Sequence, residues 1–139
     1  MSMLYPHIFA TKRIGKTFVA ACVGGELHEI GIRMVSDFFE IEGWDTYYLG
    51  ANTPADTILQ AIDDNQAQLV GLSAAMPYHR KLIRETISKI RNSDTGKNVK
   101  IIIGGNAINI RKGQYDSFGA DGFAPDAENA TKIGAELTK

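Results

Sequence analysis

Short runs of apolar residues alternate along the chain with longer segments in which apolar positions recur every three to four residues. The short runs are typical of strands buried on both faces, and the longer segments are typical of amphipathic helices. Five such units follow one another, which predicts a parallel sheet wrapped by helices. The expected strands are residues 17–23, 45–49, 69–73, 100–103 and 122–124.

The helical segments carry their own start and stop signals. Asn52 and Thr53 supply a cap, and Pro54 takes the first position of a helix that ends near Asn65. Asp126 caps a last helix that ends at Leu137. The other expected helices are residues 29–42, 79–92 and 110–117. Two of these have an apolar stripe, made of Ile30, Met34, Val35, Phe38 and Ile41 in the first and of Leu82, Ile83, Ile87 and Ile90 in the second.

Five βα units of this kind predict one α/β domain. Parallel crossovers are right-handed, and 2-1-3-4-5 is one of the two common strand orders for a doubly wound sheet. We therefore expect a single Rossmann-like, flavodoxin-like domain over residues 17–139, preceded by an extension at 1–16. In such sheets ligands bind beyond the carboxyl ends of the strands, where the winding reverses between the first and third strands.

Composition narrows the classes of function. The chain has 139 residues, 44% of them hydrophobic, which suits one globular domain. Its formal net charge of -1 leaves no basic surplus to attract nucleic acid. The single cysteine, Cys22, lies in an apolar run, which favours a buried thiol in a reducing compartment such as the cytoplasm. We expect neither a signal peptide nor a membrane span, because no apolar stretch is long enough.

Three segments at strand ends stand out from this frame. Residues 25–31 read G-E-L-H-E-I-G after the first strand, residues 73–75 read S-A-A after the third, and residues 104–107 read G-G-N-A after the fourth. His28 lies in a glycine-bounded loop, so its imidazole can point into the ligand crevice. The small side chains of the other two segments leave a slot in which a flat ring can approach the backbone.

These segments resemble the D-x-H-x-x-G, S-x-L and G-G motifs of cobalamin (vitamin B12)-binding domains over nearly the whole chain. The resemblance implies that His28 is the lower ligand of cobalt, replacing the cofactor's own benzimidazole. It also implies that Ser73 contacts the base of the displaced nucleotide tail, and that Gly104 and Gly105 give the tail room. The cofactor-binding residues it implies are Glu26, Leu27, His28, Glu29, Ile30, Gly31, Ser73, Ala74, Ala75, Gly104, Gly105 and Asn106.

The chemistry of imidazole agrees with this role. Neutral imidazole is a good ligand for transition metals, and its second nitrogen commonly donates to a carboxylate, for which Glu26 is the candidate. Glu26 stands where the family has Asp, and Ala75 stands where S-x-L has Leu. Both departures affect the surroundings of the ligand, and we expect ligation itself to survive them. Acid should weaken the bond between His28 and cobalt, since a protonated histidine cannot bind the metal.

The loop also bears on the type of cobalamin protein. Methyl-carrying corrinoid proteins continue their histidine loop as H-D-I-G-K-N-I-V, whereas residues 28–35 read H-E-I-G-I-R-M-V. This is more similar to the loops of B12-dependent light sensors and regulators. We therefore expect a sensory or regulatory cobalamin module, with a corrinoid methyl carrier of a methyltransferase system as the alternative. A haem-binding sensor of the same fold is a further alternative, since histidine ligates either metal.

Other doubly wound domains fit less well. A phosphorylated receiver domain needs an aspartate after the third strand, where this chain has Ser73, and a dinucleotide site needs G-x-G-x-x-G at the first helix, where the glycine spacing is wrong. No general base or substrate pocket is evident beyond the corrin crevice, so we do not expect a complete enzyme. Both leading functions require a partner protein or domain, and an exposed corrin face could support a homodimer.

Overall fold

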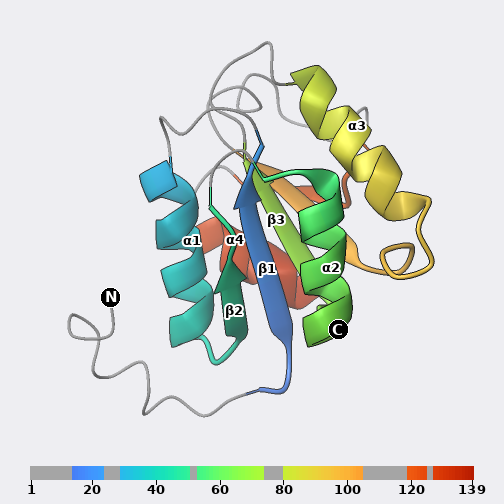
Figure 1. The fold of residues 1–139 in the computed structure, drawn as a ribbon. Coiled ribbons are helices and arrows are strands. Elements are labelled where there is room, and N and C mark those ends of the chain that lie inside the picture. Colours follow the sequence, from blue (N-terminus) through green and yellow to red (C-terminus); the bar gives the residue numbers. More distant parts are fainter. Residues whose placement is uncertain (1–13, 24–28, 51–52, 74–79, 105–118, 125–126) are drawn as a thin grey trace.

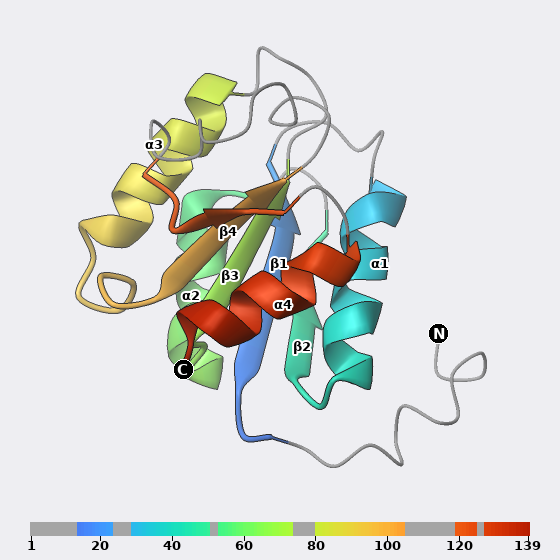
Figure 2. The same cartoon turned by 180° about the vertical axis from the view of Figure 1, so that it is seen from behind.

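The computed structural model describes residues 14–23, 29–50, 53–73, 80–104, 119–124 and 127–139, without the side chains of residues 29–31 and 80. It contains a parallel five-stranded sheet in the order β2-β1-β3-β4-β5, which confirms the expected fold class and strand order. Figure 1 labels β2, β1 and β3 in this sheet, and Figure 2 adds β4 beside β3. The strands are β1 (Thr17–Cys22), β2 (Asp45–Tyr48), β3 (Leu69–Ser73), β4 (Lys100–Gly104) and β5 (Gly122–Phe123). The helices are α1 (Glu29–Ile41), α2 (Ala55–Asn65), α3 (Arg80–Arg91) and α4 (Ala127–Leu137).

In the described part of the chain, two helices cover each face of the sheet. Helices α2 and α3 lie on one face and helices α1 and α4 on the other (Figure 1 and Figure 2). All six residues of β1 are buried, and so are the first four of β3. Successive strand residues point to opposite faces, so both faces of these strands must be apolar. This is why the strands read as unbroken apolar runs in the sequence.

An aromatic cluster fills the core beneath α1 and α4. The rings of Phe18 and Phe39 stack with centroids 4.0 Å apart, and Trp44 meets Phe39 edge to face at 5.1 Å. Two glycines make room for these rings. A Cβ atom at Gly71 would lie 2.6 Å from the Phe18 ring, and one at Gly134 would lie 2.8 Å from Phe39.

The apolar stripe expected for α1 is correct at Val35, which is partly buried and packs against the core beneath α1 and α4, but wrong at three other positions. Met34, Phe38 and Ile41 are exposed by 51%, 37% and 43%, whereas Ile32 and Phe39 are buried. Helix α1 has two neighbouring apolar stripes, and sequence periodicity cannot rank them. The stacking of Phe39 on Phe18 selects the second stripe. The side chain of Ile30 lies outside the described residues.

Smaller corrections concern helix positions. Pro54 is extended (φ -70°, ψ 156°), so it is the N-cap of α2 rather than its first helical residue, and its carbonyl accepts from the amides of Thr57 and Ile58. On α3 the expected residues Ile83, Ile87 and Ile90 are buried, but Leu82 is 41% exposed. The expected helix at 110–117 and the cap at Asp126 lie outside the described residues.

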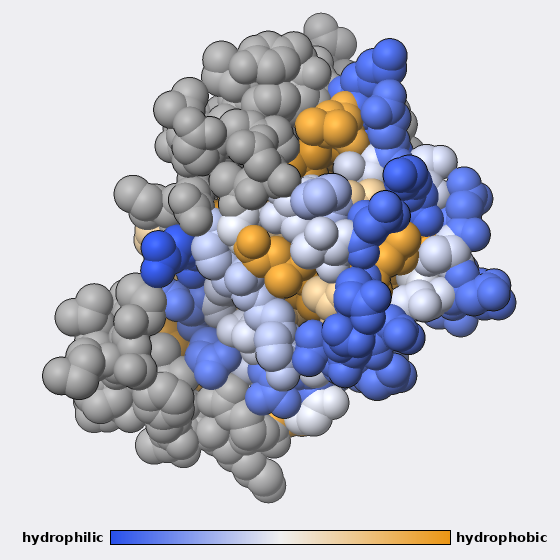
Figure 3. Space-filling view, viewed as in Figure 1, coloured by the Kyte–Doolittle hydropathy of each residue, from blue (hydrophilic) through white to orange (hydrophobic). Residues whose placement is uncertain are grey.

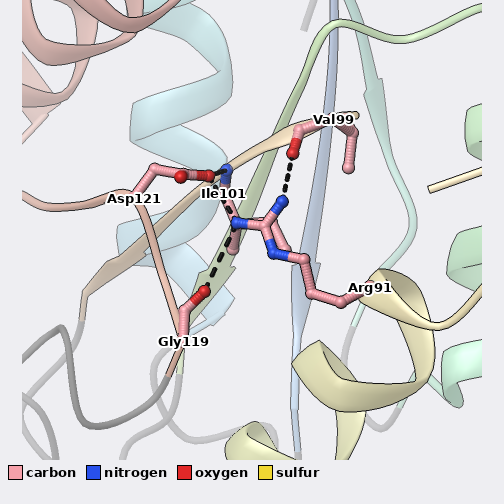
Figure 4. A network of polar contacts seen from close by, with 5 residues as sticks. All are labelled: Arg91, Val99, Ile101, Gly119 and Asp121. Atoms are coloured by element: carbon pink, nitrogen blue, oxygen red, sulfur yellow. Dashed lines mark hydrogen bonds and ion pairs between the residues drawn. The ribbon is translucent and has the colours of Figure 1, made fainter. Parts of the chain in front are cut away.

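A polar clasp joins the end of α3 to two strands (Figure 4). The Arg91 guanidinium donates to the carbonyl of Val99 at 2.6 Å, to the carbonyl of Gly119 at 3.3 Å and to the Asp121 carboxylate. The same carboxylate accepts from the amide of Ile101 at 2.8 Å. The clasp therefore fixes the start of β4 beside the approach to β5.

The molecular surface around α2 and α3 is mainly hydrophilic, with hydrophobic groups in small separate patches (Figure 3). None of the helices in the described part of the chain has the length and apolar character that a membrane crossing needs.

Candidate functional site

The carboxyl ends of three strands lie next to one another at one edge of the sheet. In the pairing of β1 with β3, Cys22 is opposite Ser73, and in the pairing of β3 with β4, Ser73 is opposite Gly104. Figure 1 shows the tips of β1 and β3 at the same edge. Of the three segments singled out in the sequence, the second begins at Ser73 and the third at Gly104, which end β3 and β4, and the first begins three residues after the end of β1. The strand order thus places Ser73 beside the reversal of winding between β1 and β3, and Gly104 next to Ser73.

The structure describes only part of the expected site. Ser73 and Gly104 are described together with the strands that pair with them, and residues 29–31 are described as the first turn of α1 by their backbone alone. The remaining expected residues lie outside the described residues: Glu26, Leu27, His28, Ala74, Ala75, Gly105 and Asn106.

Ser73 has a neighbour that sequence reasoning missed. Its hydroxyl oxygen lies 3.4 Å from the Cys22 sulfur, and its carbonyl accepts from the amide of Val23 at 2.8 Å. Cys22 is only 3% exposed, whereas Ser73 is partly exposed. Cys22 and Ser73 both lie at the carboxyl ends of strands, and this is the feature of the sequence from which their contact could be predicted. It becomes informative only once the pairing of β1 with β3 is known.

Gly104 is explained by the packing of the protein itself. A Cβ atom there would lie 2.9 Å from the carbonyl oxygen of Ala124, closer than van der Waals contact allows. The peptide after β5 therefore requires a residue without a side chain at this position, whether or not a ligand also does. The expectation that Gly104 makes room for a nucleotide tail stays a prediction.

The side chains that end the strands at this edge are small, as a slot for a flat ligand requires. The three neighbouring strands end in a thiol, a hydroxyl and a glycine, all of which occupy little volume. A hollow of about 700 Å³ lies elsewhere, at the amino ends of β3 and β4, and is lined in part by Gln68, Lys100 and Thr138.

The structure describes only some of the side chains that could bind a metal. His7, His28 and His79 are the histidines of the chain, and all of them lie outside the described residues. Within the described ranges, no group of three or more His, Cys, Asp or Glu side chains is placed to hold a metal ion.

Comparison with known proteins gives a consistent result. The family described as the B12 binding domain matches residues 16–133. Dimethylamine corrinoid protein 1 of Methanosarcina acetivorans is 28% identical over 134 residues, which are 96% of this chain and 62% of that protein. The chain thus spans about three fifths of the length of this curated relative.

Solved structures of similar fold carry related names. A cobalamin-binding protein from Desulfitobacterium hafniense matches with a TM-score of 0.80 and 27% identity, covering 92% of this chain and 60% of that one. The methanol:cobalamin methyltransferase complex of Methanosarcina barkeri matches with a TM-score of 0.79 and 23% identity, covering 93% of this chain and 48% of that one. At that identity the second match shows the fold alone.

Proposed function

This chain belongs to the B12-binding domain family, and we propose that it is a corrinoid methyl carrier that works with partner methyltransferase proteins. Cobalamin is its cofactor. The observation that carries the proposal is the similarity over nearly the whole chain to a protein named for dimethylamine and a corrinoid. Because the chain spans only part of that relative, the activity and the partners of the whole protein belong to the proposal.

The residues of this chain would divide the work of holding the cofactor. His28 would hold the cobalt through an imidazole nitrogen, and Glu26 would accept a hydrogen bond from the other ring nitrogen and so orient the imidazole. When bound, cobalamin supplies a cobalt centre that can accept and release a methyl group.

The slot beside the sheet would take the nucleotide tail. Ser73 would contact the base of the tail, and Gly104, Gly105 and Asn106 would line the passage. The small side chains at the described strand ends support this arrangement, since bulky residues there would close the edge of the sheet. The remaining residues that we assign to the cofactor are Leu27, Glu29, Ile30, Gly31, Ala74 and Ala75.

A sensory role is the second candidate, and the histidine loop favours it. Residues 28–35 read H-E-I-G-I-R-M-V, which is more similar to regulatory B12 domains than to methyl carriers. In that case a change at the upper cobalt ligand would alter contacts with an output domain. Location in the cytoplasm and assembly as a homodimer also stay proposals, the first supported by the single buried thiol.

Loading the protein with cobalamin tests the ligation. Purified wild type, His28→Ala and His79→Ala are incubated with hydroxocobalamin and desalted, and their visible spectra are recorded. We expect wild type and His79→Ala to stay coloured with an imidazole-ligated spectrum, and His28→Ala to lose that spectrum. A colourless wild type would reject cobalamin binding, and equal changes in both variants would reject His28 as the ligand.

Acid should release the imidazole from cobalt. Ligation requires a neutral imidazole ring. Protons compete with cobalt for the ring nitrogen as the pH falls towards the unperturbed histidine pKa of about 6.5 and below it. We expect the ligated spectrum to persist at pH 8 and to decline on titration to pH 5. The spectrum of His28→Ala should not change in this way over the same range.

A further pair of measurements separates the two functions. Protein loaded with hydroxocobalamin is reduced to the Co(I) state with an added chemical reductant and mixed with a corrinoid methyltransferase and its methylated substrate. A second sample, loaded with adenosylcobalamin, is illuminated. Formation of methylcobalamin without a response to light supports the carrier. A light-induced spectral change with a change in oligomeric state, and no methylation, supports the sensor.

A further inference from the structure

A buried thiol contacts a partly exposed hydroxyl at the edge of the sheet, between β1 and β3, where the winding reverses. Cys22 and Ser73 are paired across β1 and β3, and their sulfur and oxygen atoms are 3.4 Å apart. The thiol is almost fully buried, whereas the hydroxyl is at the partly exposed end of β3. Cys22 is thus in contact with the one expected tail-contacting side chain that the structure describes.

The backbone around the thiol is held on both sides. The amide of Cys22 donates to the carbonyl of Gly50 at 2.9 Å, and the carbonyl of Cys22 accepts from the amide of Thr53 at 3.2 Å. The Thr53 hydroxyl donates to the same Gly50 carbonyl at 2.8 Å. The backbone that carries the sulfur is therefore held in place by the fold itself.

We propose that Cys22 is a positioning residue that orients the Ser73 hydroxyl, and so favours corrinoids that carry a nucleotide tail over those that lack one. The inference rests on the proposed cobalamin site. A base nitrogen in the tail is a hydrogen-bond acceptor, so the Ser73 hydroxyl must donate to it. A hydroxyl that donates its only proton still has lone pairs that can accept, and the Cys22 thiol is a donor within reach.

This role makes a prediction that simple packing does not. If Cys22 only filled space, its loss would alter the binding of every corrinoid alike, through stability or shape. If it orients Ser73, its loss should affect only ligands that Ser73 touches. Cobinamide is the matched probe, because it keeps the corrin ring and cobalt but lacks the nucleotide.

The experiment is a double-mutant cycle read with two ligands. Calorimetric titration gives the Kd of hydroxocobalamin and of cobinamide for wild type, Cys22→Ala, Ser73→Ala and the double variant. Cys22→Ser is the control that keeps a small side chain with a donor. Thermal unfolding of each apoprotein shows whether it is folded at the titration temperature.

We expect Cys22→Ala to weaken cobalamin binding by about 2- to 5-fold. This effect is at the low end of the range for loss of a hydrogen bond, because a thiol is a weak donor. Cobinamide binding should stay unchanged, Cys22→Ser should bind cobalamin as wild type does, and the loss should vanish in the Ser73→Ala background. Equal losses for both ligands, or the same loss in that background, would overturn the role of Cys22 while leaving cobalamin binding intact. A wild type that binds neither ligand would overturn the proposed function and this inference with it.

Discussion

Asp37 on α1 carries a carboxyl group that is partly withdrawn from water. Burial raises its pKa above the usual 3.8, and the charge of Arg33, which acts in the opposite direction, does not cancel the effect. The folded state then binds more protons than the unfolded state between 3.8 and the raised pKa. The free energy of unfolding therefore falls as the pH rises through that window, and Asp37 costs stability at neutral pH.

Replacing Asp37 with asparagine should remove this cost. We expect Asp37→Asn to raise the Tm at pH 7, because the amide has no charge to desolvate, and the gain should shrink to nothing as the pH falls below 3.8. Thermal unfolding followed by circular dichroism over this pH range is the measurement. Asp63→Asn, at an exposed position on α2, is the control. A gain that is independent of pH would contradict the explanation.

At the scale of elements, the apolar residues of helix α1 look alike in the sequence but differ in burial. Phe39 is fully buried between Phe18 and Trp44, whereas the adjacent Phe38 is 37% exposed. The hydrophobic effect rewards only the area that leaves water, so the two phenylalanines contribute unequally to the same helix.

The two phenylalanines give a matched pair of substitutions. We expect Phe39→Ala to lower the free energy of unfolding by about 3–5 kcal/mol, because it empties the centre of the aromatic cluster. Phe38→Ala should cost less than about 1 kcal/mol, as at other partly exposed positions. Urea unfolding of the apoproteins gives both values. Similar costs for the two variants would mean that α1 presents its other stripe to the sheet.

At the scale of the whole molecule, the core has two halves, one on each face of the sheet, and the same strands contribute side chains to both. Phe18 and Ala20 of β1 face α1 and α4, while Val19 and Ala21 face α2 and α3. Neither core half can keep its packing when the central strand is lost. We therefore expect the domain to unfold in one cooperative transition, as small single domains usually do.

Cofactor binding at one edge should then stabilise the entire domain. At a free cobalamin concentration about 100 times the Kd, the free energy of unfolding should rise by about 2.7 kcal/mol. Urea unfolding with and without hydroxocobalamin measures the increase, and His28→Ala should reduce it at the same ligand concentration. Two separate transitions, with only one responding to the cofactor, would contradict a single cooperative unit.

The order and class of the elements follow from the sequence because their causes are local or nearly so. A strand covered on both faces is mainly apolar, as 18–22 and 69–72 are, and right-handed crossovers then leave few possible orders for the sheet. Even part of the site follows in this way. Ser73 and Gly104 end neighbouring strands, so their meeting at one edge is implied by the strand order alone.

Contacts between distant residues decided the rest. The facing of α1 depends on Phe39 reaching Phe18, the need for glycine at 104 depends on the Ala124 carbonyl, and the partner of Ser73 is a thiol fifty-one positions away in the chain. Periodicity along one segment contains no information about which other segment will pack against it. Such pairings arise only when the sheet has assembled, because three-dimensional packing selects among faces that the local pattern leaves equivalent.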